Sequence, residues 1–217
     1  MSKGKLIILE GVDCSGKSSV LNKLKKALPV IYGQDQQFVF SREPGSLLPE
    51  AEEAEEIREG ILNGFDLTTE QQAELFAESR LIHTKAIIEY LNKGINVVLD
   101  RYLLSSLVYQ GNLLGYEKIH DMNKKTEDLL IANDIIYNNI ILDINEETYY
   151  KRINARQENK DALETVDEKI IEDRIFVFNN LREGKITNGY IYKVNANGED
   201  FARICIDVIN KIYQICK

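Results

Sequence analysis

The chain has 217 residues, of which 44% are hydrophobic and 29% are charged. This composition is typical of a globular protein large enough to bury a full core, and it excludes a fibrous or disordered chain. The formal net charge of -8 argues against a protein that binds nucleic acid or a membrane surface through a basic face.

The cysteines and the first residues indicate where the protein resides. Cys14, Cys205 and Cys216 lack the spacing of a disulfide framework, and reduced thiols are typical of the cytoplasm. The apolar run that begins at Lys5 is too short for a signal peptide or a membrane span. We therefore expect a cytoplasmic protein.

Short apolar runs alternate with longer amphipathic segments along the chain. The runs are typical of strands buried on both faces, and they cover 5–10, 37–41, 95–100, 139–144 and 190–194. The segments between them predict helices over 17–27, 51–62, 69–92, 116–132, 148–156, 167–182 and 199–215. This alternation predicts an α/β fold of three layers, a five-stranded parallel sheet with helices on both faces. Because no linker interrupts the pattern, we expect residues 1–217 to form a single domain.

The first apolar run leads directly into G-V-D-C-S-G-K-S, which fits the phosphate-binding loop pattern G-x-x-x-x-G-K-[ST]. Glycines let successive amide N–H groups of such a loop point at an anion, and the following helix adds its positive end. Lys17 would contact the β- and γ-phosphates of ATP, and Ser18 would bind Mg²⁺. The predicted ATP-binding residues are Gly11, Val12, Asp13, Cys14, Ser15, Gly16, Lys17 and Ser18.

The loop alone does not distinguish kinases from other nucleotide-binding proteins. A GTPase usually also carries an N-K-x-D motif that reads the base, and the sequence lacks it. The nearest match, N-K-K-T at 123–126, has no carboxylate. A kinase is therefore favoured over a GTPase.

Further polar residues lie near the ends of predicted strands, where parallel α/β sheets bind ligands. Arg42 follows the second strand, and Asp100-Arg101 ends the third. The two arginines could hold an anionic acceptor, and Asp100 is well placed for Mg²⁺ or its waters. Phe76 and Arg80, four residues apart on one helical face, could recognise a base. Each of these residues could instead serve packing or a structural ion pair.

In this order, the motifs make the sequence resemble the thymidylate kinase family over nearly its whole length. They are L-E-G-V-D-C-S-G-K-S, S-R-E-P-G, A-E-L-F-A-E-S-R, D-R-Y-L-L-S-S-L-V-Y-Q-G and the arginine-bearing stretch 150–161. The resemblance implies a P-loop kinase fold with a mobile lid at about 150–164. It also implies ATP-dependent phosphorylation of dTMP to dTDP with Mg²⁺, and a homodimer.

The resemblance also implies which residues bind the acceptor. Asp13 would lie near its sugar hydroxyl and phosphate, while Phe76 would stack on thymine and Arg80 would reach O4. Tyr109 would leave no room for a 2′-hydroxyl group. The predicted substrate-binding residues are Asp13, Arg42, Phe76, Arg80, Arg101, Ser105, Ser106, Tyr109 and Gln110.

Some family members carry an arginine inside the P-loop, where this chain has Cys14. The resemblance therefore implies that the arginine for the transition state comes from the lid. Arg152 and Arg156 are four residues apart, so both could reach the phosphates, and Arg156 is favoured for the γ-phosphate. The predicted catalytic residues are Lys17, Asp100, Arg101, Arg152 and Arg156, and the predicted metal ligands are Ser18 and Asp100.

The sequence departs from the family pattern at two places. The usual R-E-P-G-G-T reads R-E-P-G-S-L at 42–47, and the lid's D-R-x-E is replaced by K-D-A-L-E at 160–164. These departures affect the expected contacts of the acceptor loop and of the lid. The acidic stretch 50–59 is interpreted as the solvated face of a helix, without a function.

Other functions remain as alternatives. A deoxynucleoside kinase needs a carboxylate base, for which Glu43 could serve. That family tends to carry a tryptophan after its Glu-Pro pair, and this chain has no tryptophan. A kinase of another nucleoside monophosphate is also compatible with the motifs. A nucleotide-binding module without turnover is favoured only by the altered lid motif.

Overall fold

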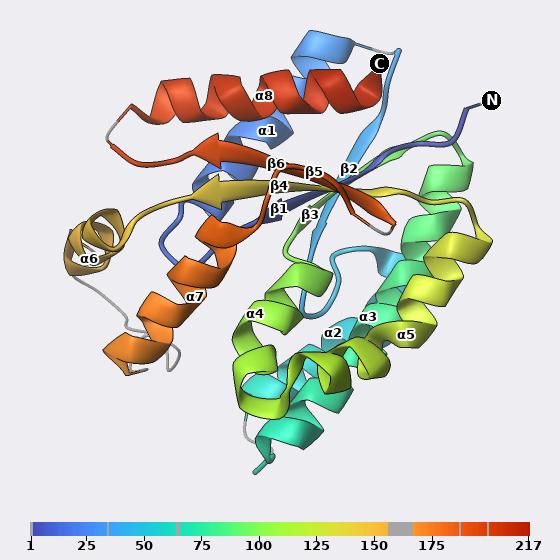
Figure 1. Cartoon of the computed structure of the whole chain (residues 1–217). Coiled ribbons are helices and arrows are strands. Elements are labelled where there is room, and N and C mark those ends of the chain that lie inside the picture. The colour runs from blue at the N-terminus through green and yellow to red at the C-terminus, as the bar shows by residue number, and fades with distance from the viewer. Residues whose placement is uncertain (1, 34, 64–65, 156–166, 187, 199) are drawn as a thin grey trace.

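The computed structural model describes residues 2–33, 35–63, 66–155, 167–186, 188–198 and 200–217. Its centre is a six-stranded sheet with the strand order β2-β3-β1-β4-β6-β5 (Figure 1). The strands are β1 (Leu6–Glu10), β2 (Phe38–Arg42), β3 (Asn96–Asp100), β4 (Tyr137–Asp143), β5 (Gly184–Ile186) and β6 (Gly189–Asn195).

The first strand lies in the middle of the sheet and is buried on both faces, as its continuous apolar sequence predicts. It pairs in parallel with β3 through Leu6 and Val97, and with β4 through Leu6 and Tyr137. Successive side chains point to opposite faces. Ile7 and Leu9 therefore share one core with α1 and α8, whereas neighbouring residues of β1 share a second core with α3.

The prediction of five parallel strands is wrong in one respect, because the described residues contain a sixth strand. β5 pairs antiparallel with β6 at one edge of the sheet. It has three residues, two of them exposed glycine and lysine, so it carries no apolar run that sequence analysis could detect. The other five strands coincide with the predicted runs and are parallel to one another.

Helices cover both faces of the sheet, which confirms the predicted three layers. In Figure 1, α1 and α8 lie on one face, and α3 and α5 lie on the other. The helices are α1 (Lys17–Tyr32), α2 (Glu52–Leu62), α3 (Thr69–Asn92), α4 (Leu103–Leu114), α5 (Tyr116–Ala132), α6 (Glu146–Ala155), α7 (Glu168–Asn180) and α8 (Phe201–Cys216), with a short 3-10 turn η1 (Pro49–Ala51) before α2. None of the described helices is long and apolar enough to cross a membrane.

Two helices differ from the sequence prediction. Helix α4, which was not predicted, is separated from β3 by only two residues, and its apolar residues are interrupted by Ser105-Ser106 and by 110–112. Helix α1 was predicted to end at Ala27, but it continues to Tyr32 with Pro29 inside its last turns. Because α4 begins so close to β3, it presents its first turn to the carboxyl ends of β1 and β3.

The apolar face of α8 provides a matched test of the core. Ile212 is fully buried, whereas Ile206 on the same helix is 57% exposed. We expect Ile212→Ala to lower the free energy of unfolding by about 2–5 kcal/mol, because it leaves a cavity in a packed core. Ile206→Ala should change it by less than about 0.5 kcal/mol. Chemical denaturation of both variants measures the difference, and equal effects would contradict this description of α8.

Candidate active site at the carboxyl edge of the sheet

The predicted phosphate-binding loop connects β1 to α1, in the strand–loop–helix context that the sequence indicates. Gly11, Cys14 and Gly16 all have positive φ, at 141°, 61° and 99°. A Cβ atom on Gly11 would lie 2.8 Å from the carbonyl oxygen of Leu142, so only glycine fits there. No side chain caps the start of α1, which leaves its first amide N–H groups available to an anion.

Lys17 is buried, and its ammonium group lies inside its own loop. Its Nζ donates to the carbonyl oxygens of Gly11 and Val12 at 2.8 and 2.7 Å, and to Oγ of Ser15 at 3.3 Å. Burial, followed by the charge of Arg101, lowers the pKa of Lys17 to about 8. The lysine therefore carries a costly buried charge that is held by backbone oxygens.

Arg101, which follows β3, lies directly against this loop. It adopts a φ of 68°, and its Nη2 forms an ion pair with the carboxylate of Asp13. Its Nη1 donates to the carbonyl oxygen of Gly11 and to Oγ of Ser105, both at 3.2 Å. Burial alone would raise the pKa of Asp13, but Arg101 and then Lys17 hold that pKa below its usual value.

Tyr109 of α4 completes this cluster. Its hydroxyl donates to Oδ2 of Asp13 at 2.9 Å and accepts from the backbone N–H of Asp13 at 3.1 Å. The guanidinium carbon of Arg101 lies 4.9 Å from the centroid of the Tyr109 ring. The structure thus brings together three predicted residues, Asp13, Arg101 and Tyr109.

Glu10 is a fully buried carboxylate that sequence analysis did not assign to the site. It accepts from the backbone N–H and Oγ of Ser105, at 3.3 and 2.6 Å, and from the N–H of Tyr102 at 2.8 Å. Burial raises its pKa, an effect that its hydrogen bonds reduce. Glu10 fixes the first turn of α4 against the end of β1. In the sequence, a charged residue at the end of an apolar strand was the feature that could have indicated this role.

Arg80 lies in a second, fully buried polar network. Its Nε donates to Oε2 of Glu43 at 2.6 Å, its Nη1 to Oδ1 of Asn123 at 2.5 Å, and its Nη2 to Oγ of Ser106 at 2.9 Å. Glu43 also contacts Nδ1 of His83 at 3.3 Å. The predicted residues Arg80 and Ser106 are therefore adjacent, and Glu43 is an ion-pair partner.

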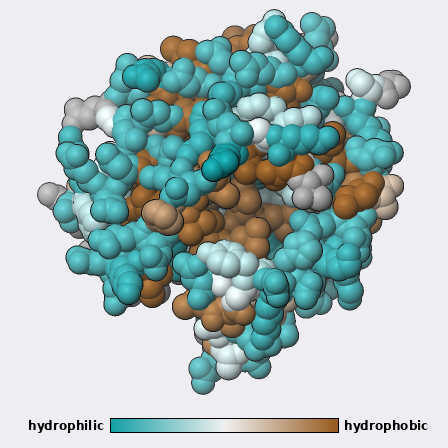
Figure 2. All heavy atoms as spheres, viewed as in Figure 1, coloured by the Kyte–Doolittle hydropathy of each residue, from teal (hydrophilic) through white to brown (hydrophobic). Residues whose placement is uncertain are grey.

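Two other predicted acceptor residues lie on the same helices as Arg80 and Ser106. Phe76 lies one turn before Arg80 on α3 and is partly exposed, whereas Gln110 of α4 is buried. Within the described part of the chain, no hydrogen bond joins either side chain to the clusters described above. Figure 2 shows apolar side chains at the bottom of a hollow in the middle of the viewed face, with hydrophilic side chains around it.

Arg42 is held by the acidic helix α2, to which the sequence assigned no function. Its Nη2 forms an ion pair with Oε1 of Glu55 at 2.5 Å, and its Nε is buried without a hydrogen bond. Glu55 also pairs with Arg58 at 3.2 Å and accepts the N–H of Ser46 at 3.0 Å. Glu55 therefore links α2 to the loop that follows β2.

Ser18 and Asp100 fit the oxygen ligands that a magnesium ion prefers. The Oγ of Ser18 lies 3.5 Å from Oδ2 of Asp100, and Oδ1 of Asp100 is buried without a hydrogen-bond partner. Among the described residues, no group of three or more His, Cys, Asp or Glu could form an all-protein metal site. A P-loop site does not need one, because phosphates and waters supply its other ligands.

Arg152 of α6 also reaches the phosphate loop. Its Nη1 donates to the carbonyl oxygens of Cys14 and Ser15, at 3.1 and 2.9 Å, and its Nη2 to that of Ala196 at 2.6 Å. Arg152 therefore supports the P-loop through hydrogen bonds to its backbone carbonyl groups. Arg156 and the rest of the predicted lid to residue 164 lie outside the described residues.

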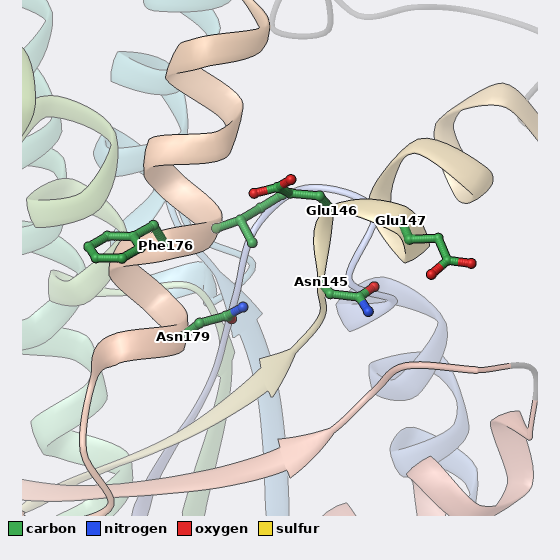
Figure 3. Close-up of a pocket in the computed structure, with 6 residues that line it drawn as sticks. Asn145, Glu146, Glu147, Phe176 and Asn179 are labelled. Atoms are coloured by element: carbon green, nitrogen blue, oxygen red, sulfur yellow. The ribbon is translucent and has the colours of Figure 1, made fainter.

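A pocket between α6 and α7 contains none of the predicted residues. It is lined by Asn145, Glu146, Glu147, Ile175, Phe176 and Asn179, five of which are labelled in Figure 3. Its acidic side chains do not suit a phosphate. The candidate site is therefore the edge of the sheet around the P-loop.

Comparison with known proteins agrees with this arrangement. The family model for thymidylate kinase matches residues 9–194. The chain belongs to the thymidylate kinase family. A thymidylate kinase of Brachyspira hyodysenteriae is 34% identical, over 97% of this chain and 94% of the relative. One of Staphylococcus haemolyticus is 31% identical, over 96% and 95% of the two chains.

The solved thymidylate kinase of Ehrlichia chaffeensis has the same fold as this family member, with a TM-score of 0.64. The match covers 97% of this chain and 99% of that structure at 22% identity. Membership of the thymidylate kinase family confirms the predicted fold class and the resemblance seen in the motifs.

The burial of Lys17 predicts how stability changes with pH. Its pKa is about 8 in the folded chain and about 10.4 in an unfolded one, so between these values the unfolded chain binds the extra proton. The stability of the wild type should therefore rise with pH relative to Lys17→Met, by about 2 kcal/mol between pH 7 and pH 10. Denaturation at several pH values measures this difference.

Lys26→Met is the matched control, because Lys26 is exposed on the same helix. Its stability difference from the wild type should stay constant over the same pH range. A constant difference for Lys17→Met as well would contradict the assigned burial of the ammonium charge.

Proposed function

We propose that the protein transfers the γ-phosphoryl group of ATP to dTMP, giving ADP and dTDP. One observation carries this proposal: Arg101 contacts the P-loop directly, through Asp13 and the carbonyl of Gly11. The donor's phosphates and the acceptor's phosphate would therefore be bound by groups that touch one another. Such fixed proximity is the main contribution that a protein can make to phosphoryl transfer.

On the donor side, the amide N–H groups of the P-loop and the start of α1 would hold the phosphates of ATP. The ammonium of Lys17 would exchange its bonds to loop oxygens for bonds to the β- and γ-phosphates. Ser18 and Asp100 would hold Mg²⁺, directly or through water, and the ion would neutralise charge on the transferred group.

On the acceptor side, Arg101 and Arg42 would bind the phosphate of dTMP. A phosphate monoester is largely dianionic at neutral pH, because its second pKa is about 6, so a strong general base is unnecessary. A deoxynucleoside kinase would need such a base, and its candidate Glu43 is already ion-paired with Arg80 at 2.6 Å. This contact disfavours that alternative.

The base would be read by Phe76 and Arg80, and the sugar by Tyr109 with the residues around Gln110 and Ser105. Each nitrogen of Arg80 makes one hydrogen bond within the protein, yet a guanidinium has five N–H groups. The remaining N–H groups can donate to a carbonyl of thymine. The buried network would hold Arg80 in place for this contact, as a preorganised site requires.

We assign the transition-state role in the lid to Arg156, while Arg152 supports the loop through its carbonyls. We also propose that residues 1–217 form one domain and that the enzyme is a cytoplasmic homodimer. Exposed apolar side chains on α4 and α5, including Leu113, Tyr116 and Ile131, are available for such an interface.

Turnover with different acceptors tests the proposed reaction. Release of ADP from ATP and Mg²⁺ should be fast with dTMP and slow with dUMP, dCMP, dGMP or thymidine. Preference for thymidine would instead identify a nucleoside kinase, and absence of turnover with every acceptor would identify a binding module.

Replacing Arg101 by Ala tests the acceptor site. We expect the KM for dTMP to rise at least about tenfold, since a charged hydrogen bond to phosphate is lost. Affinity for an ATP analogue should fall by less, because the backbone N–H groups of the P-loop and Lys17 bind its phosphates directly. Arg203→Ala, on the exposed surface of α8, is the control and should behave as the wild type. Unchanged dTMP kinetics in Arg101→Ala would refute the role given to this residue.

A further inference from the structure

Helix α7 brings one more arginine to the site, which neither the motifs nor the resemblance indicate. Arg174 is only 9% exposed, and its Nε is buried without a hydrogen bond. Among the residues that the structure describes, no carboxylate lies within ion-pair distance of its guanidinium group. This is unusual, because buried charges in proteins are normally paired.

The surroundings of Arg174 belong to the acceptor side of the site. Its guanidinium carbon lies 4.3 Å from the centroid of the Tyr109 ring, the ring that Arg101 also contacts. Helices α4 and α7 pack against each other at this point. The positive charge of Arg174 also contributes to the lowered pKa of Asp13, so Arg174 interacts electrostatically with the P-loop carboxylate.

None of the described side chains neutralises this charge by an ion pair. The carboxylate of Asp13 is already bonded to Arg101 and to the hydroxyl of Tyr109. An arginine stays protonated in proteins, so burial cannot discharge it. A contact with an aromatic face compensates only part of the cost of removing a guanidinium from water. An anion that enters the site would satisfy the unbonded Nε and the remaining N–H groups.

We propose that Arg174 of α7 binds the phosphate group of the nucleoside monophosphate acceptor, together with Arg101. This inference rests on the proposed function. The acceptor phosphate fits better than the triphosphate of ATP, because Arg174 lies against the same Tyr109 ring as Arg101, the residue assigned to the acceptor phosphate.

Comparison of a phosphorylated with an unphosphorylated ligand tests this role. In Arg174→Gln, calorimetry should show at least about a tenfold loss of affinity for dTMP, unchanged affinity for thymidine, and unchanged affinity for an ATP analogue. Arg174→Lys keeps the charge and should recover part of the affinity for dTMP. Arg182→Gln, which removes an exposed arginine just after α7, should match the wild type.

The possible results separate phosphate binding from a purely structural role. Equal losses of affinity for dTMP and thymidine, or no loss for dTMP, would overturn the proposal. If Arg174→Gln does not fold, the charge-retaining Arg174→Lys decides by the same dTMP-to-thymidine comparison. Failure of the proposed function is detected separately, because wild-type turnover would then be fastest with an acceptor other than dTMP. In that case the same binding comparison is made with the monophosphate and the nucleoside of that acceptor in place of dTMP and thymidine.

Discussion

The ion pair between Arg101 and Asp13 is the contact on which the geometry of the site depends. β1 and β3 are neighbours in the sheet, so the loops that follow them leave from the same edge. The ion pair joins those two loops, and Tyr109 secures it from α4 through Asp13. Movement of either loop would break several partly buried polar contacts at once. The residues assigned to the donor and to the acceptor therefore form one rigid unit.

The parts that the sequence predicts well are those encoded locally. The P-loop is a contiguous pattern, and its glycines have the positive φ values that the pattern requires. The central strands are continuous apolar runs, and burial of β1 on both faces follows from that composition. The positions of Arg42 and Arg101 at strand ends follow from topology alone, since parallel strands all end at one edge.

Contacts between distant elements could not be predicted in this way. The partners of Arg80 are Glu43, Asn123 and Ser106, which come from a loop and two helices. The ion pair of Glu55 with Arg42 was not predicted, because the acidic stretch that contains Glu55 resembles an ordinary solvated helix surface. Arg174 has no motif around it, and only the packing of α7 on α4 shows that it faces the site.

The short strand β5 also affects how the molecule behaves at high concentration. An outer strand exposes unpaired N–H and C=O groups, and long flat ones recruit strands from other molecules. Here the outer strand has only three residues, is antiparallel to its neighbour β6 and includes the exposed Lys185. It offers little backbone for intermolecular pairing, and a second chain would have to desolvate a lysine. The short length and the exposed lysine of β5 therefore disfavour aggregation through that edge of the sheet.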